Sequence, residues 1–221
     1  MPSRLRPTAS PAADAILVGD PGRALLLAQE LLEQPKMSNH ARGLWGYTGR
    51  TPSGHELTVQ ATGMGGPSAA LVLADLAELG VRRAVRVGTC TGLDADLRPG
   101  QLLAVSEAHA WGGPGAREGE AVLPDPELAA RLRHRLGDDA CPGAVASLDT
   151  LHGDGVDAAA AGADAADMQT AALFARGAAL GMAIAAVLIV AETAAGDRID
   201  DDAAERAAKL AGAAAGAALS G

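Results

Sequence analysis

The chain has 221 residues, 48% of them apolar, so it can bury one sizeable hydrophobic core. Its formal net charge of −9 argues against nucleic acid as a partner, because binding to a phosphate backbone needs a basic face. The same charge does not exclude a small anion, since a few local arginines can outweigh the overall field.

Cysteine, histidine and hydropathy patterns argue against several further classes. Cys90 and Cys141 form no Cys-x-x-Cys pair and the five histidines are scattered, so neither a disulfide framework nor a metal site is predicted. No apolar run reaches the ~18 residues that span a bilayer. The N-terminal segment lacks an apolar signal core. We therefore expect a cytoplasmic protein without a membrane partner.

Strand-like and helix-like segments alternate along the chain, which favours an α/β fold with a mixed or parallel sheet. In chain order we expect a strand at 15–18, a helix at 24–32, a strand at 56–61, a helix at 69–79, strands at 83–87 and 101–108, helices at 127–136 and 167–180, a strand at 183–190 and a helix from about 202 to 219. Ser68 is the expected N-cap of helix 69–79, and Asp75 is expected to face water. Gly181 is expected to end helix 167–180. Residues 112–126 and 153–162 read as loops, residues 1–12 as a flexible tail, and residues 13–221 as a single domain.

Three of the expected strands run into glycine-rich turns, at residues 19–23, 63–68 and 88–92. Glycine permits positive φ and close approach to a ligand, and backbone amides near a helix start can bind an anion. Such turns can also serve only as connections. Three together, two with an arginine beside them, predict an anion site at the carboxyl ends of the strands.

Two arginines accompany these turns. Arg23 follows the first turn directly, and Arg86 lies inside an apolar strand, where an unpaired charge is costly. Arg86 could point to solvent from a half-exposed strand, or it could form bidentate hydrogen bonds with a bound oxyanion, with the Thr89 hydroxyl beside it. Neither the P-loop pattern nor Gly-x-Gly-x-x-Gly occurs at these turns, so a dinucleotide site has little support.

Five segments resemble the bacterial purine nucleoside phosphorylase and uridine phosphorylase family in order and spacing: Gly19-Asp20-Pro21-Gly22-Arg23, Ser38-Asn39-His40-Ala41-Arg42-Gly43, Gly63-Met64-Gly65-Gly66-Pro67-Ser68, Arg86-Val87-Gly88-Thr89-Cys90 and Asp167-Met168-Gln169-Thr170-Ala171-Ala172. The resemblance implies a three-layer α/β/α sandwich with a central mixed sheet. It also implies cleavage of a nucleoside by inorganic phosphate to give free base and pentose 1-phosphate. The family uses phosphate as co-substrate and no cofactor, and it forms homodimers or homohexamers with shared active sites.

The resemblance also implies roles for individual residues. The phosphate would be bound by Gly19, Arg23, Arg86 and Thr89, with Arg42 reaching the phosphate of a neighbouring subunit. The ribose would be bound by Met64, Met168 and Gln169. The base would be bound by Cys90, Thr91, Leu151, His152 and Asp167. The catalytic pair would be Glu192, as the acid that serves the leaving base, and Arg206 on the last helix.

This sequence departs from the family at several of these positions. Gln169 stands where the family usually has a glutamate that accepts hydrogen bonds from the ribose hydroxyls, so the sugar preference is expected to differ. Thr91 replaces a glycine beside the base. An aromatic residue that stacks on the base is missing near Leu151 and His152. The Gln-x-Arg pair that reads uracil is absent from 150–166.

Three functions remain open on these grounds. The first is a nucleoside phosphorylase with an altered base and sugar preference. The second is a phosphate-independent nucleosidase that resembles the methylthioadenosine nucleosidases, although such an enzyme does not need Arg23, Arg42 and Arg86. The third is a non-catalytic homologue that binds an anion or a nucleoside.

Overall fold

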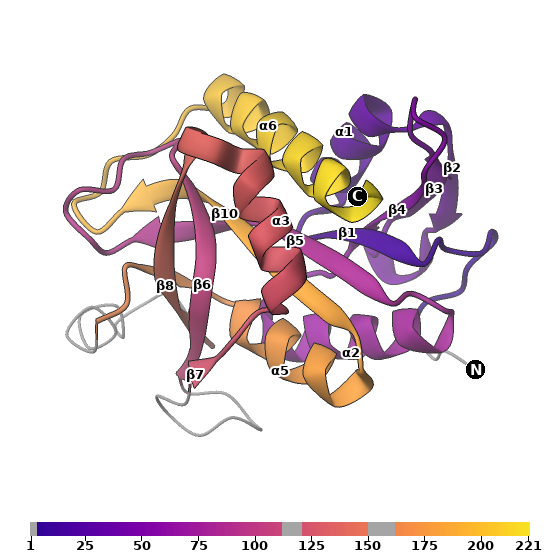
Figure 1. Ribbon diagram of the computed structural model, residues 1–221, viewed down its shortest axis with the longest axis horizontal. Coiled ribbons are helices and arrows are strands. Elements are labelled where there is room, and N and C mark those ends of the chain that lie inside the picture. The colour runs from indigo at the N-terminus through magenta and orange to yellow at the C-terminus, as the bar shows by residue number, and fades with distance from the viewer. Residues whose placement is uncertain (1–3, 112–120, 150–161) are drawn as a thin grey trace.

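The structure, a computed structural model, describes residues 4–111, 121–149 and 162–221 (Figure 1). Its helices are α1 (Pro21–Leu31), α2 (Gly65–Glu78), α3 (Pro126–Leu136), α5 (Thr170–Leu180) and α6 (Asp201–Ser220), with 3₁₀ turns η1 (Ala41–Gly43) and η2 (Gly137–Asp139). Its strands are β1 (Asp14–Val18), β2 (Glu33–Asn39), β3 (Gly46–Arg50), β4 (Glu56–Ala61), β5 (Arg83–Gly92), β6 (Leu102–Trp111), β7 (Ala121–Val122), β8 (Ala140–Leu148), β9 (Ala165–Asp167) and β10 (Ala183–Thr193).

The strands form one mixed sheet in the order β10-β6-β8-β9-β5-β1-β4-β3-β2, with β7 paired to β6. Because β10 also pairs with β5, the strands β5, β9, β8, β6 and β10 close into a ring. β1 runs parallel to β4 and β5, and β10 runs parallel to β5. The carboxyl ends of these four strands therefore lie along one edge of the sheet.

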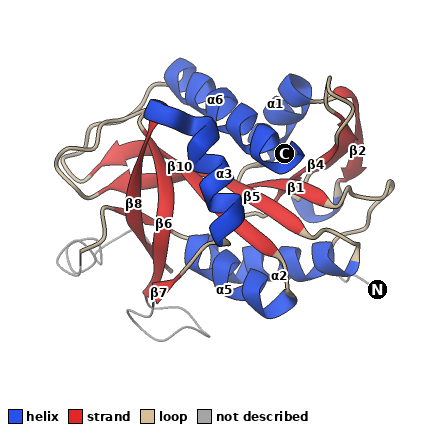
Figure 2. Ribbon diagram, viewed as in Figure 1, coloured by secondary structure: helices blue, strands red, loops and turns tan. Residues whose placement is uncertain are grey.

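Helices cover both faces of this sheet (Figures 1 and 2). α1, α3 and α6 contribute to one hydrophobic core, and α2 and α5 contribute to a second core on the opposite face. Side chains alternate along β10, so that Val187 and Ile189 enter the first core while Leu188 and Val190 enter the second. The predicted three-layer α/β/α fold with a mixed sheet is confirmed.

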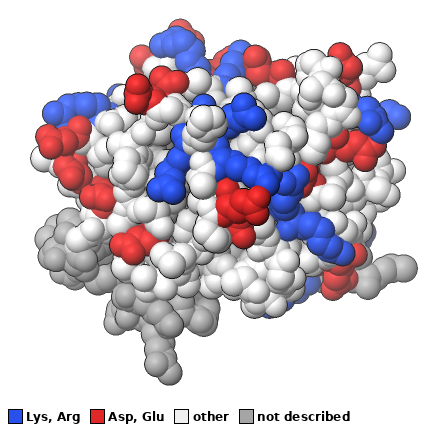
Figure 3. All heavy atoms as spheres, viewed as in Figure 1, with Lys and Arg blue, Asp and Glu red and all other residues white. Residues whose placement is uncertain are grey.

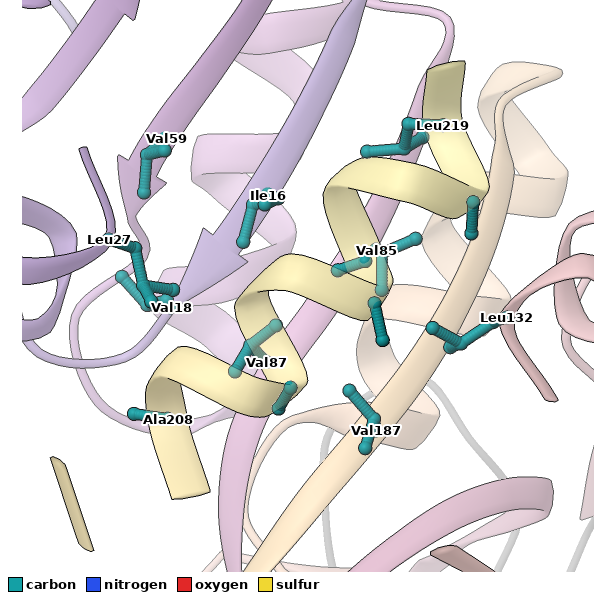
Figure 4. Packing of buried hydrophobic residues seen from close by; sticks show 14 of the residues in the cluster. Ile16, Val18, Leu27, Val59, Val85, Val87, Leu132, Val187, Ala208 and Leu219 are labelled. Atoms are coloured by element: carbon teal, nitrogen blue, oxygen red, sulfur yellow. The ribbon is translucent and has the colours of Figure 1, made fainter. Parts of the chain in front are cut away.

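The core under α6 is built from small and aliphatic side chains (Figure 4). Val87 and Val187 on the sheet, and Leu219 on α6, are at most 1% exposed. Each such aliphatic side chain contributes roughly 1.5–3 kcal/mol when it is fully buried. α6 approaches α1 closely, because a Cβ atom on Gly212 would lie only 2.6 Å from Leu27 Cδ2. The small side chains of this helix thus permit close packing against α1.

Three helices start at aspartates whose carboxylates accept a backbone N–H of the first turn. Asp20 caps α1 at 2.8 Å, Asp125 caps α3 at 2.8 Å and Asp200 caps α6 at 2.7 Å. Pro21 and Pro126 stand at the first helical positions, where a missing N–H costs nothing. These local signals fix the helix starts.

The start of α2 differs from the sequence prediction. Its N-cap is Met64, which makes no side-chain capping bond, and the Ser68 hydroxyl donates instead to the Thr62 carbonyl at 2.6 Å. Gly63 and Gly65 adopt φ of 74° and 79°, which lets the helix begin at Gly65 rather than at residue 69. The prediction of Ser68 as N-cap is therefore wrong.

Several strands were not predicted, for identifiable reasons. β2 lies at the sheet edge, where its polar, mostly exposed residues and Pro35 are tolerated. β8 opens with Cys141-Pro142-Gly143 and becomes apolar only afterwards. β9 takes the start of the predicted helix 167–180, so α5 begins at Thr170. β7 falls within the predicted loop 112–126, whereas residues 112–120 and 150–161 lie outside the described residues.

The N-terminal segment, expected to be a flexible tail, packs against α2 from residue 4 onward. Leu5 is 2% exposed, and Asp75, expected to face water, is 1% exposed. The Asp75 carboxylate accepts the backbone N–H groups of Arg4 at 2.7 Å and of Leu5 at 2.9 Å, and it forms an ion pair with the Arg4 guanidinium. The expectation for Asp75 is wrong because a partner 71 residues away neutralises its charge.

The surface carries charges of both signs, and basic side chains gather over and beside α3 (Figure 3). The last turn of this helix carries Arg133, His134 and Arg135, where cations interact favourably with the helix dipole. The dipole gives this basic group a structural explanation. Among the described residues, no helix combines the length and the apolar character that crossing a bilayer requires.

Replacing Asp75 by alanine is expected to lower the free energy of unfolding by about 2 to 3 kcal/mol, because two backbone N–H groups lose their acceptor. Urea denaturation followed by circular dichroism measures this change. Asp138→Ala, at an exposed position in η2, serves as the control and is expected to change stability by less than about 0.5 kcal/mol. Equal stability of the two variants would show that the N-terminal contacts contribute nothing.

Candidate active site

The turns that follow β1 and β4 meet at the carboxyl edge of the sheet. The Thr62 N–H donates to the Val18 carbonyl at 2.7 Å, and the Thr62 hydroxyl donates to the same oxygen at 3.0 Å. A Cβ atom on Gly19 would lie 3.5 Å from the Gly63 carbonyl oxygen. The two predicted glycine turns are therefore direct neighbours.

Arg86 lies in β5 beside these turns, and its guanidinium is turned inward. Arg86 is 4% exposed and Asp167 is 1% exposed. Arg86 Nη2 donates to Asp167 Oδ2 at 2.9 Å, which makes a buried ion pair. The alternative that Arg86 points to solvent from a half-exposed strand is excluded. Asp167, expected beside the base, instead compensates the charge of this arginine.

Further side chains complete this ion pair. Arg86 Nε donates to Thr170 Oγ1 at 3.1 Å, and Arg86 Nη1 donates to Gln169 Oε1 at 2.6 Å. Asp167 accepts the Ser147 hydroxyl at 2.5 Å and the Thr170 hydroxyl at 2.6 Å. We call these five residues the Arg86 cluster: Arg86, Ser147, Asp167, Gln169 and Thr170. They join β5, β8 and the start of α5 at one point.

Gly88 leaves the space that the guanidinium of Arg86 occupies. A Cβ atom at position 88 would lie 2.6 Å from Arg86 Cζ and 2.7 Å from Leu188 Cδ2. Any side chain at this position would push the arginine out of its place. The predicted strand 83–87 continues to Gly92, so the glycine turn predicted at 88–92 is wrong, and Gly88 serves the arginine from within β5.

Arg23, in the first turn of α1, lies close enough to Arg86 for their charges to interact. The pKa of Arg23 lies below its ordinary value, chiefly because the guanidinium is desolvated; Asp20 opposes this shift and Arg86 adds to it. Its side chain makes no hydrogen bond or ion pair with a described residue. Two neighbouring cations, one without such a bond, form a local centre of positive charge that an anion would stabilise.

Arg42 lies on the surface, in η1, with a positive φ of 59°. Asn39, 1% exposed, holds this loop, because its amide accepts the Arg6 N–H at 2.8 Å and donates to the Leu44 carbonyl at 2.5 Å. Arg42 makes no hydrogen bond with the Arg86 cluster within the described chain. It lines an open cavity of about 520 Å³ together with His40. Its side chain is thus free to meet another molecule.

Glu192 lies at the carboxyl end of β10, after a register shift between β10 and β5. It accepts the Thr91 hydroxyl at 3.2 Å and forms an ion pair with Arg198 Nη2 at 3.1 Å. Arg206, the expected partner, is exposed on α6 and forms no ion pair with Glu192. The pairing predicted for Glu192 is corrected to Arg198, which reaches it through a short hairpin whose strands are bridged at these two residues.

A cavity of about 420 Å³ opens between α2 and α5, and Met168 lines it. The rest of its wall consists of residues at the end of β8 and directly after it, of Ala110 on β6, and of Arg176 and several small residues on the two helices. Met64 is 87% exposed at the start of α2. Met168 lies between Asp167 and Gln169 in the chain, so this cavity is adjacent to the Arg86 cluster.

The remaining predicted site residues are distributed unevenly. Thr89 is partly exposed on β5. Cys90 is 4% exposed, belongs to the second hydrophobic core and lies close to the Ile189 carbonyl. Leu151 and His152 lie outside the described residues. Within the described ranges, no three His, Cys, Asp or Glu side chains come together in a way that could hold a metal ion.

The site contains residues that the sequence did not single out. The hydroxyl groups of Ser147 and Thr170 donate hydrogen bonds to the Asp167 carboxylate, and Arg198 forms an ion pair with Glu192. Ser147 stands near the end of a mostly apolar segment, which is a weak local signal. The pairing of Thr170 with Arg86 carries no sequence signal, because it depends on contacts across 84 residues.

Burial raises the pKa of the Cys90 thiol, with a smaller contribution from the Asp167 charge. The pKa of this thiol is higher in the folded protein than in the unfolded chain. The Cys90 thiol therefore contributes to stability at pH values below its unfolded-state pKa, and this contribution to the free energy of unfolding is lost as the pH rises. We expect iodoacetamide at pH 8.5 to spare Cys90 in the native protein and to modify it in guanidinium chloride, as read by mass spectrometry. Cys141, partly exposed, is the internal reference. Equal labelling of Cys90 in both states would place its thiol at an open surface.

Solved structures of two other proteins have a fold closely similar to that of this chain. The chain is similar to a purine nucleoside phosphorylase from Toxoplasma gondii crystallised with immucillin-H, with a TM-score of 0.84 and 20% identity over 96% of this chain and 92% of that one. It is also similar to a uridine phosphorylase from Vibrio fischeri, with a TM-score of 0.83 and 22% identity over 95% and 92% of the two chains. At these identities the likeness concerns the fold.

Sequence relatives carry the comparison further. A DeoD-type purine nucleoside phosphorylase of Clostridium perfringens is 31% identical over 189 residues, which are 80% of each chain. One of Oceanobacillus iheyensis is 45% identical over 87 residues, but this match spans only 38% of this chain and 37% of that protein. The family model of the phosphorylase superfamily matches residues 14–220. The chain therefore belongs to the phosphorylase superfamily.

Proposed function

We propose that this protein is a nucleoside phosphorylase, which uses inorganic phosphate to cleave the N-glycosidic bond of a nucleoside. The observation that carries this proposal is the pair of neighbouring arginines, Arg23 and Arg86, beside the glycine turns of β1 and β4. The charge of Arg23 is desolvated without an ion pair to a described residue. Hydrogen phosphate supplies both the negative charge and the acceptor oxygens that such a place favours.

Arg86 can serve a phosphate although it is already paired. A guanidinium has five N–H donors, and the Arg86 cluster uses three of them, one on each nitrogen. Within the described chain this leaves one donor on each of Nη1 and Nη2. Together with Arg23, the turn at Gly19 and the hydroxyl of Thr89, these donors form the proposed phosphate site.

The reaction then follows from the arrangement. The C1′–N bond breaks and its electron pair passes to the base nitrogen, which takes up one proton. An oxygen of hydrogen phosphate bonds to C1′ and gives up its proton, so that atoms and charge balance. Positive charge builds on the sugar in between, and the negative phosphate beside C1′ stabilises it.

Glu192 is the proposed group that serves the leaving base. It lies at the carboxyl end of β10 and is held from two sides, by Thr91 and by Arg198. A carboxyl group in this position can pass a proton to the base or hold a hydrogen bond with it as negative charge develops. Arg198 acts through Glu192 and is therefore a positioning residue.

The neighbours of the phosphate site fit the other half of the substrate. We assign the pentose to the space beside Met64, Met168 and Gln169, and the base to the space near Thr91 and Glu192. The Clostridium perfringens relative is by its name a purine nucleoside phosphorylase, which favours a purine. Arg42 is proposed to reach the phosphate of a second subunit, which implies a homodimer at least, acting in the cytoplasm.

Incubation with purine nucleosides and uridine, with and without phosphate, tests the proposal directly. Free base and pentose 1-phosphate, separated by chromatography, are expected in equal amounts and only when phosphate is present. Release of base without phosphate would make the protein a nucleosidase. Binding of phosphate without release from any nucleoside would make it a non-catalytic homologue. Either of these results overturns the proposal.

Arg23→Ala is expected to raise the KM for phosphate about tenfold or more, because charge-assisted hydrogen bonds to the anion are lost. Initial rates at varied phosphate measure this value. The variant should stay folded, since the Arg23 side chain makes no bond within the described residues. Arg133→Ala, exposed on α3, is the matched control and should leave the KM unchanged. An unchanged KM in Arg23→Ala would remove this arginine from the phosphate site.

A further inference from the structure

Gln169 makes four hydrogen bonds within the protein. Its Oε1 atom accepts Arg86 Nη1 at 2.6 Å and the Thr62 hydroxyl at 3.1 Å. Its Nε2 atom donates to the Gly63 carbonyl at 2.7 Å and to the Gly65 carbonyl at 3.3 Å. An amide side chain offers two acceptor positions and two donors, and each of them has a partner here, with the Thr62 proton shared between Gln169 and the Val18 carbonyl.

The partners of Gln169 also fix which way its amide lies. Arg86 is only a donor, so it requires the amide oxygen, whereas the carbonyls of Gly63 and Gly65 are only acceptors and require the NH₂ group. The side chain is 3% exposed. Gln169 is thus a buried tie between β5 and the turn from β4 to α2, with no hydrogen-bonding capacity left for a ligand.

The other polar groups of this wall are engaged as well. Asp167 accepts hydrogen bonds from Arg86, Ser147 and Thr170 and is 1% exposed. The Thr62 hydroxyl has a single proton, and it shares this proton between Gln169 Oε1 and the Val18 carbonyl oxygen. A sugar hydroxyl that enters beside Gln169 therefore meets groups whose hydrogen bonds are already made, apart from the two Arg86 N–H groups that the proposed phosphate site uses.

The position of the pentose follows from the proposed phosphate site. A phosphate oxygen forms a bond to C1′ in the proposed reaction, so C1′ must lie against the anion held by Arg86. C2′ is the carbon next to C1′ and therefore lies near the same anion. Gln169 is hydrogen-bonded to Arg86, and Met168, which precedes Gln169 in the chain, lines the cavity between α2 and α5. The wall next to C2′ is thus the one that Gln169 forms.

We propose that the pentose subsite selects 2′-deoxynucleosides over ribonucleosides, an inference that rests on the proposed phosphorolysis. A 2′-hydroxyl would lose its hydrogen bonds to water here and find no replacement, whereas a CH₂ group at C2′ has none to lose. A site whose polar groups bind a substrate hydroxyl rejects a substrate that lacks this hydroxyl. Here the polar groups are already hydrogen-bonded within the protein, so we expect the opposite preference, for the substrate without the 2′-hydroxyl.

Gln169→Glu is the variant that reopens the subsite. A carboxylate cannot donate to the carbonyls of Gly63 and Gly65, and its negative charge is repelled by both oxygens. At least one of its oxygens is then displaced toward the pentose, where it can accept a hydroxyl. The ratio of kcat/KM for ribonucleoside to kcat/KM for deoxynucleoside should rise about tenfold or more in this variant.

The experiment compares inosine with 2′-deoxyinosine in the presence of phosphate, with hypoxanthine release as the readout. For the unmodified protein we expect a higher kcat/KM with 2′-deoxyinosine, by about three- to thirtyfold. A higher kcat/KM with inosine would overturn the inference and leave the proposed phosphorolysis intact. No hypoxanthine from either nucleoside would overturn the phosphorolysis, and the inference with it.

Gln60→Glu is the matched control for the variant. Gln60 is 1% exposed, and its amide donates to the carbonyls of Leu44 and Ala61, both at 2.9 Å, outside the Arg86 cluster. The Gln60→Glu variant also places a buried carboxylate against carbonyl oxygens, so it should lower stability. It should not change the ratio of kcat/KM for ribonucleoside to kcat/KM for deoxynucleoside. An unchanged ratio in Gln169→Glu, or an equal shift in both variants, would show that Gln169 does not set the preference. If Gln169→Glu does not fold, the ratio in the unmodified protein still decides.

Discussion

The buried ion pair between Arg86 and Asp167 joins two parts of the chain that are 81 residues apart. Removing both charges from water costs several kcal/mol per ion, and their attraction offsets this cost only when their other hydrogen bonds are made. Thr170 bonds to both members, Ser147 bonds to the carboxylate and Gln169 to the guanidinium. β5, β8 and the start of α5 must therefore hold their relative positions for the pair to be tolerated, and these elements build the candidate site.

The same pair determines where positive charge is available. Asp167 balances the charge of Arg86, so this arginine mainly supplies directed N–H groups, while Arg23 supplies charge that lacks an ion-pair partner among the described residues. In a protein with a formal net charge of −9, attraction of an anion depends on such a local arrangement. The sheet makes it local, because parallel strands bring the turns after β1, β4 and β5 to one edge.

Features that act within a few residues could be predicted from the sequence, and they account for the fold class, most helices and the glycine turns after β1 and β4, whereas the turn predicted at 88–92 is part of β5. The partner of Arg86 could not, because Asp167 is distant in the chain and reaches it only when β9 pairs with β5. The partner of Glu192 was mistaken for a different reason. Resemblance to a family segment favoured Arg206, whereas the hairpin geometry brings Arg198 to the carboxylate. For Leu151 and His152 the sequence remains the source of the expectation.

The identities of residues 167 and 169 depend on each other. If Gln169 were a glutamate, two carboxylates would flank one buried guanidinium, and the second would face the carbonyl oxygens of Gly63 and Gly65. One arginine cannot balance two such charges without water. With Asp167 already buried on Arg86, the neutral amide is the side chain that satisfies every partner. The sugar preference proposed for this protein is thus a consequence of how the ion pair is completed.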